Sequence, residues 1–152
     1  MLIAIIGESC TGKSTLAEKL RTRLGAEVYT GKDYLRLRKN ESEAAEAFRA
    51  LLREAVAGGP VIYVISEREH LALLPEGAVR VLMTAELATI QERFAARMRG
   101  KLSAPVAAML EKKHGCFDGE PCDIHLFSDQ SDLDAVCDRL AAWGKQHENH
   151  SL

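Results

Sequence analysis

A nine-residue stretch near the start of the chain, GESCTGKST at residues 7–15, carries the pattern G-x-x-x-x-G-K-[ST]. Its glycines let backbone N–H groups turn inward around phosphate oxygens, and Lys13 is placed to reach the β- and γ-phosphates of a nucleotide. The hydroxyl of Ser14 is a ligand of the kind that binds Mg²⁺ in such loops. The stretch therefore predicts a nucleoside triphosphate site made by Gly7, Glu8, Ser9, Cys10, Thr11, Gly12, Lys13, Ser14 and Thr15.

The flanks of this stretch favour the same prediction. Before it, LIAIIG is short, apolar and rich in isoleucine, which is typical of a buried parallel strand. After it, STLAEKLRTRLG places three leucines on one helical face and stops at Gly25. Strand, glycine loop and helix form the context that the phosphate-binding pattern requires. The alternative is a glycine turn that happens to precede a helix.

Cys10 is the unusual residue of the loop. A side chain at this position requires either a backbone angle that a Cβ tolerates or some local strain. Because backbone N–H groups, a helix start and Lys13 surround it, we expect Cys10 to be the fastest of the four cysteines to alkylate. A buried, inert thiol is the alternative.

Strand and helix patterns alternate along the rest of the chain. Strands are predicted at 2–7, 27–30, 61–66, 78–85 and 123–129. Helices are predicted after the loop, twice within 33–57, and at 85–99, where a buried stripe runs from Leu87 to Met98. Two more are predicted: one between a Ser103 cap and Gly115, and one from about Ser131, which has capping-box spacing to Asp134. The alternation predicts an α/β fold, a three-layer sandwich around a five-stranded parallel sheet.

Composition narrows the function further. The 152 residues suit a single domain, 1–152, and 47% hydrophobic residues are enough to build its core. A net charge of −2 gives no support to a nucleic-acid or anionic-membrane partner, and no apolar run approaches the ~20 residues that span a bilayer. The six-residue apolar start does not resemble a signal peptide. Four scattered cysteines without a disulfide pattern favour a reducing, cytoplasmic location.

Ligands in parallel sheets bind outside the carboxyl ends of the strands. Three segments follow those ends here, at 30–59, 66–77 and 99–122. We therefore expect a second substrate to bind among them, with 30–59 as a short acceptor-binding insert and 99–122 as a lid.

Three segments resemble the nucleoside and nucleotide kinases, in particular adenylate and cytidylate kinases: GESCTGKST, YTGKDYLR after the second strand, and ATIQERFAARMRG after the fourth. The ending CDIHLFSDQSDLDAVCDRL is similar to the last strand and helix of cytidylate kinase-like proteins. The resemblance spans nearly the whole chain, and only the phosphate loop is a stringent match. It implies a T-G-D-x-x-R-like segment for the acceptor monophosphate and an R-x-x-x-R-type helix that opens a mobile lid.

Phosphoryl transfer spreads negative charge over the equatorial oxygens, and positioned cations stabilise it. The catalytic candidates are Lys13, Asp33, Arg93 and Arg97. Arg93 and Arg97 lie four residues apart on one helical side, from which they could close on the triphosphate; a solvated helix edge is the alternative. Asp33 is placed to orient the acceptor or take its proton, and its alternative role is a helix cap.

The acceptor is predicted to contact Asp33, Arg36, Arg38 and Arg68. A planar guanidinium holds two phosphate oxygens at once, although these residues also suit a basic, solvated surface. After the third strand, ISEREH replaces the D-G-F-P-R of adenylate kinases, so Arg68 stands in for the missing arginine. Glu67 is the nearest carboxylate that could orient Mg²⁺ through water, and both residues also suit an ordinary loop.

The polar cluster His114, Cys116, Cys122 and His125 has the spacing H-x-C-x5-C-x2-H. This spacing does not match the paired knuckles of a structural zinc site, so we favour no metal there.

The sequence thus predicts a cytoplasmic, ATP- and Mg²⁺-dependent kinase that acts on a small molecule, most readily a nucleoside monophosphate or nucleoside. The absence of an N-K-x-D stretch favours ATP over GTP. Two alternatives remain open: a small-metabolite kinase of the shikimate or gluconate kinase type, and a non-catalytic ATP-binding regulatory module. The oligomeric state is not predicted.

Overall fold

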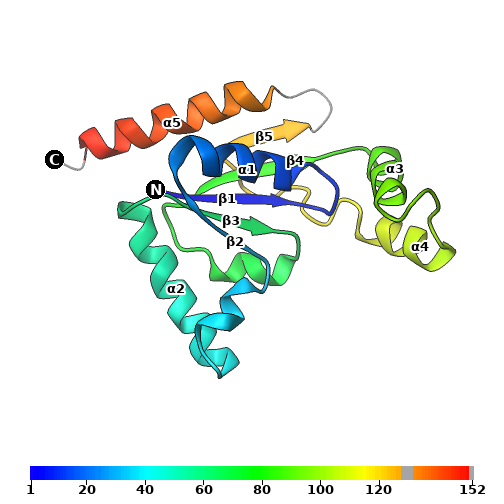
Figure 1. The fold of residues 1–152 in the computed structure, drawn as a ribbon, viewed down its shortest axis with the longest axis horizontal. Coiled ribbons are helices and arrows are strands. Elements are labelled where there is room, and N and C mark those ends of the chain that lie inside the picture. Colours follow the sequence, from blue (N-terminus) through cyan, green and yellow to red (C-terminus); the bar gives the residue numbers. More distant parts are fainter. Residues whose placement is uncertain (128–131, 151–152) are drawn as a thin grey trace.

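A five-stranded, all-parallel sheet forms the middle of the molecule in a computed structural model that describes residues 1–127 and 132–150, with side chains described to residue 145 (Figure 1). The strand order is β2-β3-β1-β4-β5. The strands are β1 (Leu2–Gly7), β2 (Glu27–Thr30), β3 (Val61–Ile65), β4 (Val79–Thr84) and β5 (Ile124–Phe127). Each predicted strand is present, and the bounds differ from the prediction by at most two residues.

Hydrophobic patterning explains which strands are central. Every residue of β1 and β3 is buried, as expected for strands covered on both faces. In the edge strand β5, buried and exposed residues alternate, with Ile124 and Leu126 on the covered face. In β2, at the opposite edge, only Tyr29 is fully buried.

Helices cover both faces of the sheet (Figure 1). On one face lie α1 (Lys13–Leu24) and α5 (Leu133–His150), and on the other lies α2 (Glu41–Ala57). Two short 3₁₀ helices, η1 (Asp33–Leu37) and η2 (Arg68–Leu73), follow β2 and β3. Beyond the carboxyl ends of the strands stand α3 (Leu87–Arg97) and α4 (Ala104–Lys113), which pack on each other. The predicted α/β three-layer fold is confirmed.

Each face of the sheet has its own hydrophobic core. The core under α1 and α5 contains Leu16, Leu20 and Leu140 with Ile3, Ile5 and the other residues of that strand face. The core under α2 is centred on aromatic rings, with Phe48 edge-on to Tyr63 at a centroid distance of 4.8 Å. Alternate residues of the same strands enter the two cores, so the sheet couples them.

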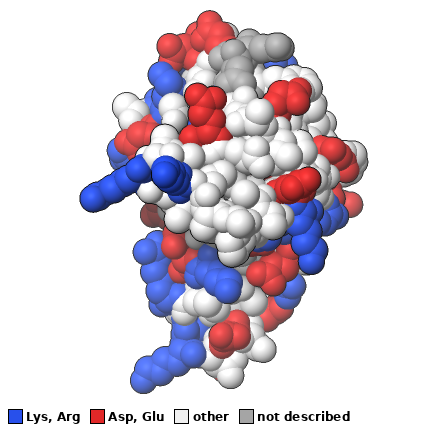
Figure 2. All heavy atoms as spheres, turned by 90° about the vertical axis from the view of Figure 1, so that its right-hand side faces the viewer, with Lys and Arg blue, Asp and Glu red and all other residues white. Residues whose placement is uncertain are grey.

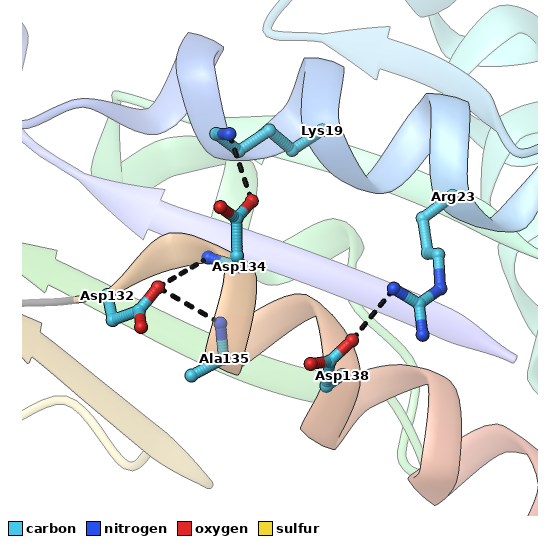
Figure 3. Close-up of polar contacts among 6 residues, drawn as sticks. All are labelled: Lys19, Arg23, Asp132, Asp134, Ala135 and Asp138. Atoms are coloured by element: carbon cyan, nitrogen blue, oxygen red, sulfur yellow. Dashed lines mark hydrogen bonds and ion pairs between the residues drawn. The ribbon is translucent and has the colours of Figure 1, made fainter.

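Ion pairs line the outer seam between α1 and α5 (Figure 3). Lys19 Nζ lies 3.0 Å from Asp134 Oδ1, and Arg23 Nη1 lies 2.7 Å from Asp138 Oδ1. All four side chains are exposed, so these pairs contribute little to the stability of the fold. No helix in the described part of the chain is long and apolar enough to cross a membrane.

Three local predictions are corrected. The first helix expected within 33–57 is only the single 3₁₀ segment η1, because Arg38 returns to an extended conformation. Met98 is not part of a buried stripe: α3 ends at Arg97, and Met98 is 48% exposed as its C-cap. The last helix begins at Leu133, and Asp132 caps it by accepting the N–H groups of two residues in the first turn (Figure 3). Ser131, the predicted cap, lies outside the described residues.

Candidate phosphate-binding site

The loop between β1 and α1 is shaped by two glycines. A Cβ on Gly7 would lie 2.4 Å from the Met83 carbonyl oxygen and 2.8 Å from Thr11 Oγ1, so only glycine fits where the loop crosses β4. Gly12 has φ of 95°, a left-handed conformation that lets the chain turn into α1. The loop is therefore held close to the sheet, at the N-terminus of a helix.

Cys10 adopts φ of 65° in the same loop, which is rare for a residue with a side chain. Its carbonyl oxygen accepts a hydrogen bond from Arg93 Nη1 at 3.1 Å, so α3 supports the strained backbone. The thiol is only 5% exposed and packs with Ile90 and Leu110, on α3 and α4. Cys10 is therefore buried, which was the alternative, and is not the accessible thiol that we expected from the sequence.

Lys13 is a buried cation at the start of α1. Its side chain is 6% exposed and Nζ donates to the Glu8 carbonyl oxygen, which Thr11 Oγ1 also contacts at 2.8 Å. Burial, with a smaller contribution from the Arg97 guanidinium, lowers the pKa of Lys13 from 10.5 to about 8. A buried lysine held by a neutral carbonyl is suited to receive an anion.

The loop and α3 share one cavity of about 340 Å³. Arg93 and Arg97 line it together with Cys10, Thr11, Gly12, Thr15, Met83 and Leu133. The structure thus brings both predicted arginines of α3 to the phosphate loop. Lys13 does not itself line this cavity, but the Arg97 guanidinium is close enough to lower its pKa. Ser9, Ser14 and Thr15 are exposed on the loop and the first turn of α1.

The other side of the loop contacts α4 and the turn that follows it. His114 Nδ1 lies 3.2 Å from Glu8 Oε1, and the Glu8 side chain is 11% exposed. Two residues after β3 are bound to the same turn: Glu67 pairs with Lys113 at 3.3 Å, and Arg68 donates to Glu120 Oε1 at 2.7 Å. Both residues are therefore already paired, at a place where the sequence predicts contacts to Mg²⁺ and substrate.

The remaining acceptor candidates follow β2. Asp33 Oδ2 accepts the Thr30 N–H at 2.8 Å, a bond back to the end of β2, whereas the N-cap of η1 is Lys32 and no side chain caps that helix. The Arg36 guanidinium lies 6.0 Å from the centre of the Tyr29 ring, and Arg38 donates to the carbonyl of its neighbour. Within the described residues, no hydrogen bond or ion pair joins these three side chains to the phosphate loop.

The predicted His–Cys cluster is dispersed. His125 Nε2 lies 2.8 Å from Thr84 Oγ1, His114 contacts Glu8, and Cys122 is exposed. Burial raises the pKa of Cys116. Among the residues whose side chains the structure describes, no group of three or more metal-ligating side chains is gathered in one place.

Sequence reasoning missed His70. The residue is 4% exposed on η2, and its Nδ1 is buried without a hydrogen-bond partner among the described residues. It lines a separate cavity of about 350 Å³ between η1, α2 and η2. Only the occurrence of a histidine among apolar residues after β3 pointed to it, and that signal is weak.

The chain was compared with known proteins by sequence and by structure. No protein-family model matches the sequence, and no curated protein matches it. Solved structures do match. A gluconokinase from Sinorhizobium meliloti 1021 has a TM-score of 0.59 at 16% identity, with 98% of this chain and 94% of that chain covered. A shikimate kinase from Bacteroides thetaiotaomicron has a TM-score of 0.58 at 15% identity, with 95% and 98% covered.

The tunicamycin resistance protein of Deinococcus radiodurans has a TM-score of 0.62 at 21% identity, covering 93% of this chain and 94% of that one. At such identities the likeness establishes the fold. Together with the loop at residues 7–15, it defines this chain as a protein with the P-loop kinase fold.

Proposed function

We propose that this protein is a small-molecule kinase that transfers a phosphoryl group from ATP, with Mg²⁺, to an acceptor. The single observation that carries the proposal is the buried Lys13 of the phosphate loop, together with the Arg93 and Arg97 side chains that line the cavity at the same loop. Three cations around one loop match the charge that develops on a transferring phosphoryl group.

Each side chain has a distinct role in this proposal. The loop N–H groups and Lys13 bind the β- and γ-phosphates, while Arg93 and Arg97 stabilise the charge on the transferred group. Ser14, exposed at the start of α1, would hold Mg²⁺, with Glu67 as a more distant partner through water. The metal, when bound, neutralises phosphate charge. The uncharged hydrogen-bond partner of Lys13 fits an anionic ligand.

The acceptor is either a nucleoside monophosphate or nucleoside, as the resemblance implies, or a small metabolite of the shikimate or gluconate type. The second class is supported by the names of the matched structures, a gluconokinase and a shikimate kinase. Figure 2 shows the side of the molecule on which α3 and α4 lie. Basic and acidic side chains are interspersed there around a largely uncharged middle, which suits a small ligand better than a polyanion.

A coupled assay that measures ADP release tests the proposal, with ATP, Mg²⁺ and a panel of nucleoside monophosphates, nucleosides and sugar acids. We expect Lys13→Met to lower kcat/KM by about 100-fold or more, because a preorganised cation is removed from developing charge. The matched control is Lys145→Met, an exposed lysine on α5, which should retain wild-type activity. Near wild-type turnover by folded Lys13→Met would contradict the proposal. ATP binding without ADP release for any acceptor would instead support the non-catalytic module.

A further inference from the structure

A second cavity lies on the face of the sheet that α2 covers. It has a volume of about 350 Å³, within the range of small-molecule pockets, and it is enclosed by η1, α2 and η2. Its polar lining consists of two cations, two carboxylates, a tyrosine and a histidine: Lys32, Arg49, Glu41, Glu69, Tyr34 and His70. The cavity therefore carries charges of both signs around one buried group.

The buried group is the imidazole of His70. It is 4% exposed, and Nδ1 has no hydrogen-bond partner within the described residues. Its ring lies near Tyr34 and Tyr63, at centroid distances of 6.2 Å and 6.4 Å, and Nε2 is 3.7 Å from Glu69 Oε1. Buried polar atoms are almost always paired, so an unpaired one on a residue that lines a cavity points to a partner supplied by a ligand.

The charges that border the cavity indicate an acidic ligand. Arg49 already has an exposed acidic neighbour, because its Nη1 lies 2.7 Å from Glu46 Oε1 on the same helix. The Lys32 side chain has no ion pair or hydrogen bond within the described part of the chain, so it is the cation available to an acidic group. The carboxylates of Glu41 and Glu69 face the same cavity and are acceptors for ligand hydroxyls.

The aromatic ring that lines the cavity already packs against other rings of the protein. Tyr34 stacks on Phe48 with a centroid distance of 5.4 Å and an interplanar angle of 13°. Towards His70 its ring is arranged edge to face, with an interplanar angle of 80°. A nucleobase is usually held by an open aromatic or apolar face. Tyr34 is the aromatic side chain of this lining, and its ring already packs against Phe48 and His70.

We propose that this cavity recognises the phosphoryl acceptor and that the acceptor is a small, non-aromatic molecule with several hydroxyls and one acidic group, a carboxylate or a phosphate ester. Lys32 binds the acidic group, and His70 Nδ1 accepts a hydrogen bond from a ligand hydroxyl, which makes His70 a specificity-determining residue. The role of this ligand as phosphoryl acceptor rests on the proposed kinase function. Binding of the ligand to the cavity does not depend on that function and can be measured by itself.

Isothermal titration calorimetry without ATP tests the site. The probes are gluconate and shikimate as hydroxy acids, glucose 6-phosphate as a phosphate ester, and AMP and CMP as nucleotides. We expect at least one hydroxy acid or the ester to bind and the nucleotides to bind at least tenfold more weakly. Lys32→Gln should weaken that binding about tenfold or more, while Lys39→Gln, an exposed lysine outside the cavity, should leave it unchanged.

His70 gives a second, independent measurement. His70→Phe removes the unpaired atom, so we expect a higher Tm without ligand together with a loss of binding of at least tenfold. His70→Asn keeps a polar atom near the position of Nδ1 and should recover part of the binding. A lower Tm for His70→Phe with unchanged affinity would show that the imidazole serves only the packing, and would overturn the assignment.

The outcomes separate this site from the kinase function. Binding that the Lys32 and His70 substitutions weaken, without ADP release, upholds the site and refutes the kinase. ADP release with a nucleotide acceptor that is indifferent to both substitutions refutes the site and leaves the kinase standing. If none of the five probes binds the wild-type protein, the ligand class is wrong.

Discussion

Lys13 keeps its charge at neutral pH although the Glu8 carbonyl oxygen is its only hydrogen-bond acceptor among the described residues and the nearby Glu8 side chain offsets only part of the cost of burial. Burial lowers its pKa from 10.5 to about 8, so a protonated Lys13 opposes folding of the ligand-free protein. The same burial strengthens its attraction for phosphate, because the surroundings screen charge poorly. The buried His70 Nδ1, which has no hydrogen-bond partner among the described residues, is a second group whose burial opposes folding of the ligand-free protein.

The first prediction follows from the pKa of Lys13. Below pH 8 the lysine is protonated in both the folded and unfolded states, so the full penalty of burying the charge is present. Between pH 8 and 10.5 the folded protein releases the proton first, and its stability rises with pH. We expect Lys13→Met to be more stable than wild type at pH 7, by a difference on the order of 3 kcal/mol at most, and that difference to shrink towards pH 10.5.

Urea denaturation at pH 7 and pH 10 measures this difference, and adding a saturating nucleotide should reverse its sign at pH 7 in favour of wild type. A stability difference that stays the same at both pH values would mean that Lys13 is not the group that titrates.

At the scale of elements, α3 contributes two arginines that differ in what they touch. Both line the cavity, but Arg93 also supports the loop by bonding the Cys10 carbonyl, whereas Arg97 lowers the pKa of Lys13. We therefore expect Arg93→Ala to weaken ATP binding and lower kcat, because the strained loop loses its support. Arg97→Ala should lower kcat by about tenfold or more, with a smaller effect on ATP affinity. Calorimetric measurement of ATP affinity and steady-state kinetics test both variants. If Arg97→Ala lowered ATP affinity and kcat/KM equally and left kcat unchanged, Arg97 would only bind ATP and would not stabilise the transition state.

The packing of α3 and α4 on Cys10 gives a prediction about cysteine chemistry. Cys122 is exposed, whereas Cys10 is covered by Ile90 and Leu110, so we expect iodoacetamide to label Cys122 well before Cys10. Arg68→Ala removes the bonds that fix the turn after α4, and it should raise the labelling rate of Cys10. Mass spectrometry of labelled peptides decides the order. Labelling of Cys10 ahead of Cys122 in the wild type would mean that α4 does not cover the loop in solution.

Features formed by residues close together in the sequence could be predicted, whereas contacts between distant residues could not. The phosphate loop is contiguous, and the spacing of Arg93 and Arg97 is set by one helix, so local pattern was enough to place both beside each other. The contact between Glu8 and His114 spans 106 residues, and no local pattern predicts which distant turn folds onto a loop. The burial of His70 depends on how three elements pack, which also exceeds what periodicity conveys.

At the scale of the whole molecule, one sheet is shared by two cores. Residues of β1 alternate between them: Ile3 and Ile5 face α1 and α5, while Leu2, Ala4 and Ile6 face α2. A loss of packing on either side therefore loosens the strands that carry both the phosphate loop and the cavity around His70. This coupling favours unfolding as a single cooperative transition.

The last prediction uses Phe48 and Trp143 as reporters on opposite sides of the sheet. Phe48, a residue of α2, is fully buried against the sheet, and Trp143, the only tryptophan of the chain, packs against the core of α1 and α5. We expect Phe48→Ala to lower the free energy of unfolding by about 3–5 kcal/mol, through lost burial and the cavity that it leaves. Because the two cores share strands, the tryptophan fluorescence transition in urea should shift as far as the transition seen by far-ultraviolet circular dichroism. As a control, Arg23→Ala, which breaks an exposed ion pair on the α5 side, should move neither transition appreciably. If Phe48→Ala moved the circular dichroism transition and left that of Trp143 in place, the two faces would unfold separately, and the sheet would not be the coupling element.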